Sequence, residues 1–129
     1  GGNSPAAFRR AAEFGDAWHP SHRPVEEIAA GARQFKALAK ARGRDPKSLE
    51  IVARAPLRVI TNGDVPEPRP LLVGTPEQIV QDISKYKEAG VAGFMFDTYY
   101  GNPAVNDQDL KGVLSTLETF ANQVRPRLE

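Results

Sequence analysis

The stretch EAGVAGFMFD, residues 88–97, joins a helix end to the strongest strand signal in the chain. Phe94, Met95 and Phe96 are consecutive apolar residues, and a strand without alternation is expected to be buried on both faces, as in a parallel sheet covered by helices. Residues 13–18, EFGDAW, repeat the order of helix end, glycine and strand. A repeated unit of helix and parallel strand is therefore predicted.

Helix and strand signals alternate outward from this stretch, with few hairpin signals. Strands are predicted at residues 16–19, 49–60 and 91–97, and the turn-rich residues 61–70 are predicted to be an exposed loop. Helices are predicted over residues 5–14, from Pro24 to Gly43, between Thr75 and Gly90, and from a cap at Asn106 or Asp107 through Val124. This order is typical of an α/β protein with parallel strands.

Two of the expected helices carry clear start signals. Ser4 is a good N-cap residue, and Pro5 fits the first helical position, where no amide donor is needed. Thr75 and Gln78 have the spacing of a capping box, in which each side chain satisfies a backbone amide near the helix start. These two helix starts are the firmest local predictions.

The chain length fits about half of a (β/α)8 barrel. Such a barrel uses roughly 31 residues for each of its eight units, so 129 residues provide about four units. The first of these units lacks its strand here. Residues 1–129 are therefore predicted to form a single partial domain, the C-terminal half of a TIM barrel without the N-terminal strands.

Composition excludes several classes of partner and site. The net charge is +1, with basic residues spread along the sequence, which argues against a nucleic acid or an anionic membrane as a partner. Without cysteine there are no disulfides and no thiolate ligands, and two isolated histidines give no metal site. No apolar run approaches the roughly 20 residues of a membrane span, and no signal peptide is visible. A cytoplasmic protein is expected.

The opening run Gly1-Gly2-Asn3-Ser4-Pro5 has the features of an anion site. Glycines allow backbone to approach a ligand closely, and the start of a helix presents unpaired N–H groups and a positive dipole end. A phosphate would suit this position. The alternative is that the two glycines are a cloning remnant ahead of an ordinary capped helix.

The sequence also resembles a known family. The run Gly1–Ala7, the segment Gly15–Pro20, the helix start Val73–Gln78 and the segment Glu88–Val91 before a strand that ends in Asp97 occur in the same order, at similar distances, in the C-terminal half of luciferase-like monooxygenases. The likeness covers nearly the whole chain. It is closest to the branch of the family that uses the deazaflavin coenzyme in place of FMN.

This resemblance implies a fold and a cofactor site. The fifth strand of a TIM barrel would end at Gly1 and Gly2, and the sixth, seventh and eighth strands would follow in this chain. In the family, the loop after the fifth strand holds the flavin phosphate, which assigns Gly1, Gly2, Asn3 and Ser4 as cofactor-binding residues. The loop of residues 61–72 varies between family members and gives no indication of the substrate.

Three further residues are candidates for the cofactor or substrate pocket. Trp18 and His19 end a predicted strand, and barrel active sites are built at the C-terminal ends of the strands. Asp97 ends the strongest strand. The alternatives are that Trp18 fills the core, that His19 forms a local hydrogen bond and that Asp97 serves a turn or cap. The catalytic residues cannot be named from the sequence.

The resemblance implies an oxidoreductase that passes a hydride between a deazaflavin, or FMN, and an organic substrate, or acts as a monooxygenase. The chain alone is expected to be inactive. The alternative function is a half-barrel scaffold or assembly module without its own activity. Because an incomplete barrel leaves sheet edges unpaired, a homodimer formed through exposed sheet edges is also predicted.

Overall fold

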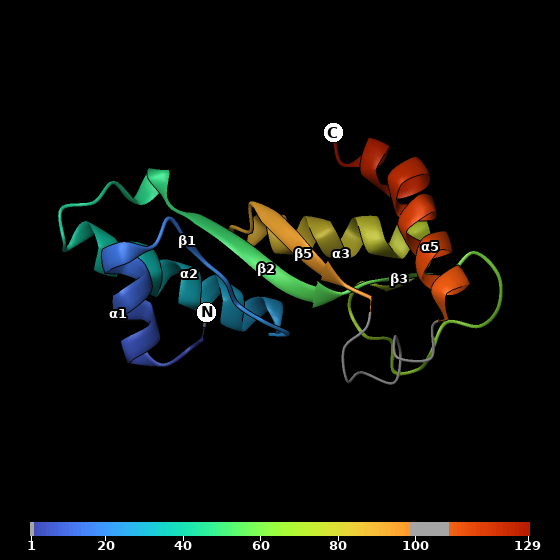
Figure 1. The fold of residues 1–129 in the computed structure, drawn as a ribbon, viewed down its shortest axis with the longest axis horizontal. Helices are drawn as coiled ribbons and strands as arrows, with labels where there is room; N and C mark the ends of the chain where they lie inside the picture. The colour runs from blue at the N-terminus through green and yellow to red at the C-terminus, as the bar shows by residue number, and fades with distance from the viewer. Residues whose placement is uncertain (1, 99–108) are drawn as a thin grey trace. The chain divides into compact units, whose positions relative to one another are not determined.

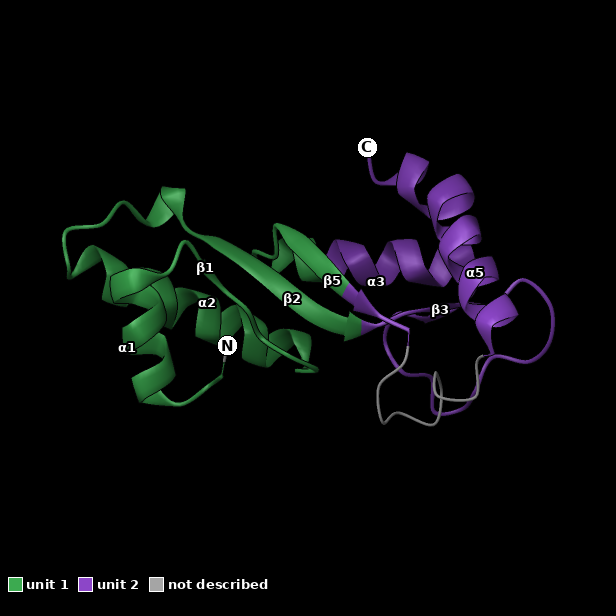
Figure 2. Cartoon of the chain, in the orientation of Figure 1, with its two compact units in different colours: residues 1–55, 86–95 green, residues 56–85, 96–129 purple. Residues whose placement is uncertain are grey.

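A computed structural model describes residues 2–98 and 109–129 (Figure 1). The chain divides into two compact units (Figure 2). Unit 1 comprises residues 1–55 and 86–95, and unit 2 comprises residues 56–85 and 96–129. Tyr99, Tyr100, Asn106 and Asp107, for which a loop and a helix cap are predicted, lie outside the described residues.

Unit 1 begins with helix α1, Pro5–Phe14. The Ser4 hydroxyl accepts a hydrogen bond from the amide of Ala7 at 3.2 Å, and Pro5 occupies the first turn. The amide of Gly15 donates to the carbonyl of Ala11 at 2.9 Å and closes the helix. The predicted start and end of this helix are confirmed. Helix α2 then extends over Val25–Lys40, with Glu26 and Glu27 in its first turn, where carboxylates favour the helix dipole.

The larger of the two described sheets has three strands in the order β1-β2-β5. Strand β1 is Ala17–Trp18, β2 is Glu50–Pro56 and β5 is Gly93–Asp97. Strands β1 and β2 are parallel, with Ala17 opposite Glu50 and Trp18 opposite Ile51. The sequence prediction of parallel strands that alternate with helices is confirmed for this pair.

Burial alternates along β2. Ile51, Ala53 and Ala55 are buried, while the residues between them are partly exposed. This is the pattern of a strand with one face against the core.

The burial predicted for β5 is wrong. None of its five residues is fully buried, and the side chain of Met95 is 53% exposed. The sheet order places β5 at the end of the described sheet, beside β2 alone. An apolar run shows that a strand can be covered on both faces, but it does not supply the neighbours that would cover it.

Unit 2 contains a second, smaller sheet that was not predicted. Strand β3, Arg58–Val59, pairs in parallel with β4, Val73–Gly74. The sequence suggested a β-rich stretch over residues 49–60, with Pro56 at its end or at a bulge, followed by a loop. Strand β2 does end at Pro56, but the pairing of β3 with β4 was missed because two-residue strands are too short to show a hydrophobic period.

Helix α3, Pro76–Glu88, has the predicted capping box. Gln78 Oε1 accepts from the Thr75 amide at 2.9 Å, and the Gln78 amide donates to the Thr75 hydroxyl at 3.3 Å. The structure therefore confirms the prediction that Thr75 caps this helix.

The last helix, α5, covers Leu110–Thr119. A short π-helical turn over Phe120–Val124 and a 3-10 turn over Arg125–Arg127 follow it. Asp109 caps α5 by accepting from the Gly112 amide at 2.8 Å. Leu110, Leu114 and Leu117 are exposed on this helix, and its buried residue is Thr116.

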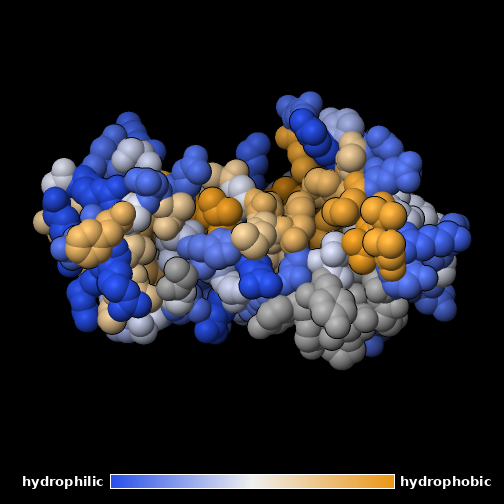
Figure 3. Space-filling model, in the orientation of Figure 1, coloured by the Kyte–Doolittle hydropathy of each residue, from blue (hydrophilic) through white to orange (hydrophobic). Residues whose placement is uncertain are grey.

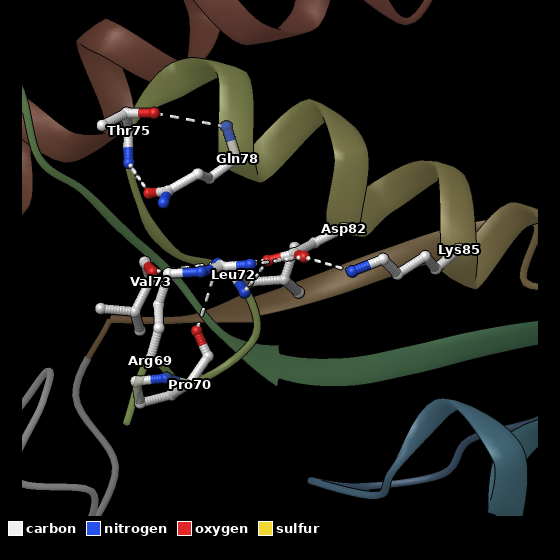
Figure 4. A network of polar contacts seen from close by, with 8 residues as sticks. All are labelled: Arg69, Pro70, Leu72, Val73, Thr75, Gln78, Asp82 and Lys85. Carbon is white, nitrogen blue, oxygen red and sulfur yellow. Dashed lines mark hydrogen bonds and ion pairs between the residues drawn. The ribbon is translucent and has the colours of Figure 1, made fainter. Parts of the chain in front are cut away.

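A buried carboxylate holds the end of the loop of residues 61–72 against α3 (Figure 4). Asp82 is completely buried and accepts two hydrogen bonds from the Arg69 guanidinium, at 2.6 and 2.9 Å. It also accepts from the amide of Leu72 at 2.9 Å and pairs with Lys85 at 3.4 Å. The loop is polar and exposed as predicted, but its C-terminal end is fixed by an ion pair that spans thirteen residues.

In the described ranges, no helix is long and apolar enough to cross a membrane. A search of the same residues for a group of three histidine, cysteine or acidic side chains close enough to hold a metal ion finds none.

Candidate functional site

The candidate cofactor site lies at the start of α1, in unit 1. Gly2 has a φ of +93°, a conformation that residues with a side chain rarely adopt, and a Cβ added there would lie 3.2 Å from the Cβ of Ala7. Gly2, Asn3 and Ser4 are exposed. Gly1, which belongs to the same predicted site, lies outside the described residues. The backbone before α1 is thus open to a ligand and needs glycine at position 2.

The side chain of Trp18 holds the backbone at Gly2 in place. Its indole Nε1 donates to the carbonyl of Gly2 at 3.0 Å. The ring is 2% exposed and packs against Phe8, with 4.9 Å between the ring centroids. It also lies so close to α2 that a Cβ at Gly31 would approach a ring carbon to 2.3 Å. Trp18 therefore fills the core of unit 1 and at the same time orients the predicted anion loop.

The structure adds Arg23, which the sequence did not indicate. With the Asn3 amide turned so that its oxygen faces the guanidinium, this oxygen accepts from Arg23 Nε at 2.6 Å and from Nη2 at 2.9 Å. Arg23 Nη1 also pairs with Glu27 at 3.3 Å. A positive group beside Asn3 adds to the positive end of the α1 dipole. Its partner is twenty residues away in sequence, so no local motif could have revealed the contact.

A cavity of about 240 Å³ lies beside this loop. Its lining includes Asn3 from the loop, Trp18 from β1, Arg23, and Glu27 and Gly31 from α2. The walls thus combine an aromatic ring, an amide, a guanidinium and a carboxylate. Such a lining suits a ligand that combines a planar apolar ring with a polar group.

His19 follows Trp18 at the C-terminal end of β1. Its Nδ1 lies 2.6 Å from the carbonyl oxygen of Val52. Because a carbonyl oxygen can only accept, the Nδ1–H group of His19 is the donor in this contact. This bond to β2, between residues 33 apart in sequence, fixes the orientation of the imidazole ring and leaves Nε2 for another partner.

Asp97, the remaining predicted pocket residue, ends β5 and belongs to unit 2. Its backbone carbonyl accepts from the amide of Leu57 at 3.0 Å. The structure therefore brings Gly2, Asn3, Ser4 and Trp18 together, and it adds Arg23 to this group. Asp97 lies in the other unit.

Comparison with known proteins gives a family for part of the chain and a fold for nearly all of it. Residues 1–64 match the family model of the luciferase-like monooxygenases. No curated protein matches the chain by sequence. The matched residues include the loop before α1, Trp18, His19 and Arg23, but not Asp97.

Solved structures share the fold over nearly the whole chain. Monooxygenase RslO1 from Streptomyces bottropensis is 18% identical with a TM-score of 0.72, and the match covers 98% of this chain and 46% of that one. An F420-dependent secondary alcohol dehydrogenase in complex with an F420-acetone adduct is 16% identical with a TM-score of 0.72, covering 99% and 47%. Riboflavin lyase RcaE, with modified FMN and riboflavin, is 15% identical with a TM-score of 0.70, covering 98% and 41%.

The chain therefore spans less than half the length of these structural relatives. Its parallel strands and alternating helices have the fold of part of a TIM barrel. The family match identifies residues 1–64 as luciferase-like monooxygenase sequence, and the structural relatives show that the whole chain has the fold of part of such a barrel.

Proposed function

We propose that this chain supplies the phosphate-binding part of a flavin-type cofactor site in an oxidoreductase. The observation that carries the proposal is the loop before α1, in which Gly2 has a positive φ, Trp18 holds the Gly2 carbonyl, and Asn3 contacts the Arg23 guanidinium. Gly1, Gly2, Asn3 and Ser4 are the proposed cofactor-binding residues, and Arg23 joins them.

The donors at this position suit a phosphate group. The start of α1 offers a positive dipole end, and a guanidinium forms strong, charge-assisted hydrogen bonds with phosphate oxygens. The Ala7 amide is already used by the Ser4 hydroxyl, and Pro5 has no amide proton. We therefore assign the phosphate contact to the backbone around Gly2 and Asn3 and to Arg23, while Ser4 keeps the helix start in place.

The coenzyme would supply the hydride or oxygen chemistry, and the protein would bind it, orient it and exclude water. Relatives of the same fold are described with FMN in one case and with F420 in another. Among the two, we propose the deazaflavin coenzyme for this chain, because the sequence motifs resemble that branch most closely. Trp18, His19 and, in the complete protein, Asp97 are proposed to line the pocket for the flavin ring or an organic substrate.

The activity is proposed for the complete protein, since the chain spans under half of its relatives' length. We expect the chain alone to bind a phosphate-bearing flavin weakly and to catalyse no turnover. The short length of the chain relative to its relatives also supports a second candidate, a half-barrel scaffold or assembly module without its own activity. A measurement of cofactor binding separates the cofactor-site proposal from the scaffold.

The test is a titration of the chain with the deazaflavin coenzyme, FMN and riboflavin, followed by fluorescence quenching. Riboflavin lacks the phosphate, so we expect it to bind ~10-fold or more weakly than FMN, in line with the loss of a charge-assisted contact. Arg23→Gln should weaken FMN binding by a similar factor and leave riboflavin binding unchanged. Arg9→Gln, on the exposed side of α1, is the matched control and should change neither.

Two results would contradict the proposal. A flat response to all three compounds would favour the scaffold. Equal binding of FMN and riboflavin, or equal effects of Arg23→Gln and Arg9→Gln, would show that any flavin binding does not use the loop before α1.

A further inference from the structure

Strand β2 has one face toward the helices and one face away from them. Trp18 lies opposite Ile51 and packs against α2, so the face that carries these two residues is the one toward the helices. Val52 and Arg54 alternate with the buried residues of β2 and point to the other face. In a barrel, that other face lines the interior. Over β2, Figure 3 shows hydrophilic residues beside hydrophobic ones.

The residues that follow β1 continue its register along β2. A parallel bridge joins Ser21 to Arg54, and the amide of Arg54 donates to the carbonyl of Pro20 at 2.8 Å. His19 precedes Ser21 by two residues and therefore shares its face, with Nδ1 2.6 Å from the carbonyl oxygen of Val52. Diagonal neighbours on one face of paired strands are within reach of a long side chain. Arg54 and His19 can therefore contact the same ligand.

The backbone just after Ser21 has an unusual conformation. His22 has a φ of +50°, which is uncommon for a residue other than glycine. Its amide donates to the carbonyl of Arg54 at 2.9 Å, and its Nδ1 lies 3.0 Å from the hydroxyl of Ser21. Conformations of this kind persist where surrounding contacts hold them, and they cluster at binding and active sites. The conformation of His22 therefore supports a functional role for these strand ends.

The chemistry of Arg54 suits an anion. A barrel interior is filled mainly by bulky branched side chains such as that of Val52, and barrel active sites lie at the C-terminal ends of the strands, where Arg54 departs from this rule. A guanidinium has five N–H donors in a fixed fork that matches carboxylate and phosphate oxygens, so a contact with a protein group still leaves donors for a ligand. His19 Nε2 can donate to the same anion when the ring is protonated.

We propose that Arg54 binds an anionic group of the organic substrate, a carboxylate or a phosphate, and that His19 is the second contact. Arg54 thereby determines that the substrate is an acid or a phosphate ester rather than a neutral molecule. The assignment rests on the proposed oxidoreductase function, because it names the substrate class for that reaction. The site differs from the loop before α1, where Arg23 is assigned to the cofactor phosphate.

The experiment is an NMR titration of the chain with benzoate, phenyl phosphate and benzamide. The chain has two histidines, so His22→Gln assigns the ring signals of His19. We expect an anion to shift these signals, and the tighter of the two anions identifies the substrate class. Benzamide has the shape of benzoate without its charge and should bind ~10-fold or more weakly, since it forms no charge-assisted contact.

Three variants test the role of Arg54. Arg54→Gln should weaken binding of the tighter anion by ~10-fold or more and leave benzamide binding unchanged. Arg54→Lys keeps the charge without the planar fork, so its affinity should lie between those of Arg54→Gln and the original chain. Arg33→Gln, exposed on α2, is the matched control and should change neither. Circular dichroism and urea denaturation check that each variant is folded.

Equal binding of benzamide and both anions would overturn the proposal. So would an Arg54→Gln variant that is less stable but keeps its anion affinity, because Arg54 would then have a structural role only.

The anion site and the cofactor site can fail separately. Arg23→Gln should leave benzoate affinity unchanged, and Arg54→Gln should leave the ratio of FMN to riboflavin affinity unchanged. If Arg23→Gln weakens benzoate binding and Arg54→Gln does not, the anion binds at the loop before α1, and the assignment to Arg54 is wrong.

Discussion

At the scale of single residues, the buried carboxylate of Asp82 has the largest expected effect on stability. It is completely buried and satisfied by Arg69, the Leu72 amide and Lys85. Asp82→Ala would leave the guanidinium and a buried amide without their acceptor. We expect the free energy of unfolding to fall by about 3 kcal/mol, the lower end for a broken buried ion pair, since Arg69 is partly exposed. Chemical denaturation with urea measures this.

Lys85→Gln is the control for this prediction. Its ammonium also pairs with Asp82, but the side chain is 55% exposed, so the change should cost less than about 1 kcal/mol. Equal losses in the two variants would mean that Asp82 acts only as a surface charge.

The same residue predicts how stability depends on pH. Burial tends to raise the pKa of Asp82, but hydrogen bonds from Arg69, the Leu72 amide and Lys85, with the charge of Arg69, outweigh it and lower the pKa below its ordinary value. The carboxylate therefore adds stability above the ordinary pKa of about 3.9, and this stability is lost as the pH falls through the lowered pKa of the folded state. Thermal melts between pH 7 and pH 2 should show a loss below about pH 4 that is smaller in Asp82→Asn. An identical acid profile in that variant would refute the assignment.

Single residues also show which parts of the candidate site could be read from the sequence. Ser4 and Gly2 act locally, through a helix cap and a positive φ, and such roles depend only on neighbouring residues. The contacts of Trp18 with the Gly2 carbonyl and of Arg23 with Asn3 join segments sixteen and twenty residues apart. Sequence patterns contain no information on such distances, so Arg23 was missed and Trp18 was only placed near the site.

At the scale of elements too, features set by neighbouring residues were predicted, and features set by distant segments were not. The helix starts at Ser4 and Thr75 were predicted because a cap and its amide lie within one turn. The burial of β5 and the exposure of the leucines on α5 were not, because burial depends on which other elements are present. The β3-β4 pair was missed since two residues in each strand show no periodicity.

The packing of α2 against β1 leads to a prediction at this scale. A Cβ at Gly31 would lie 2.3 Å from a ring carbon of Trp18, which is closer than atoms can approach. Alanine favours a helix by about 1 kcal/mol over glycine, but overpacking a core costs ~1–3 kcal/mol, and a buried ring has little room to move. We expect Gly31→Ala to lower the free energy of unfolding and to change the Trp18 fluorescence, since this is the sole tryptophan.

Gly93→Ala is the matched control for Gly31→Ala. An added Cβ at Gly93 meets nothing within 4 Å, so unfolding free energy should change by less than about 0.5 kcal/mol. A stabilised Gly31→Ala variant with unchanged fluorescence would show that Trp18 can rotate away from α2, and that the helix is not held at this distance by the ring.

At the scale of the whole molecule, the chain has the fold of part of a barrel and spans less than half of its relatives. The sequence predicted this partial fold correctly, because the count of helix and strand units depends only on their order along the chain. It could not show which surfaces remain uncovered. In the described sheet, β5 lies at one end and β1 at the other.

Strand β5 forms one edge of the described sheet. Met95 is 53% exposed on a strand that has a described neighbour on one side only. Apolar side chains on an edge strand promote pairing between chains, and a lysine opposes such pairing because two copies would bring like charges together. Met95→Lys should therefore raise the concentration at which the chain aggregates, measured by light scattering. Its effect on unfolding should be small because the side chain is half exposed, and Met95→Leu should aggregate like the original chain. If Met95→Lys aggregates equally while Leu114→Glu, on α5, remains in solution, then association proceeds through the helix alone, and the predicted sheet-edge dimer is wrong.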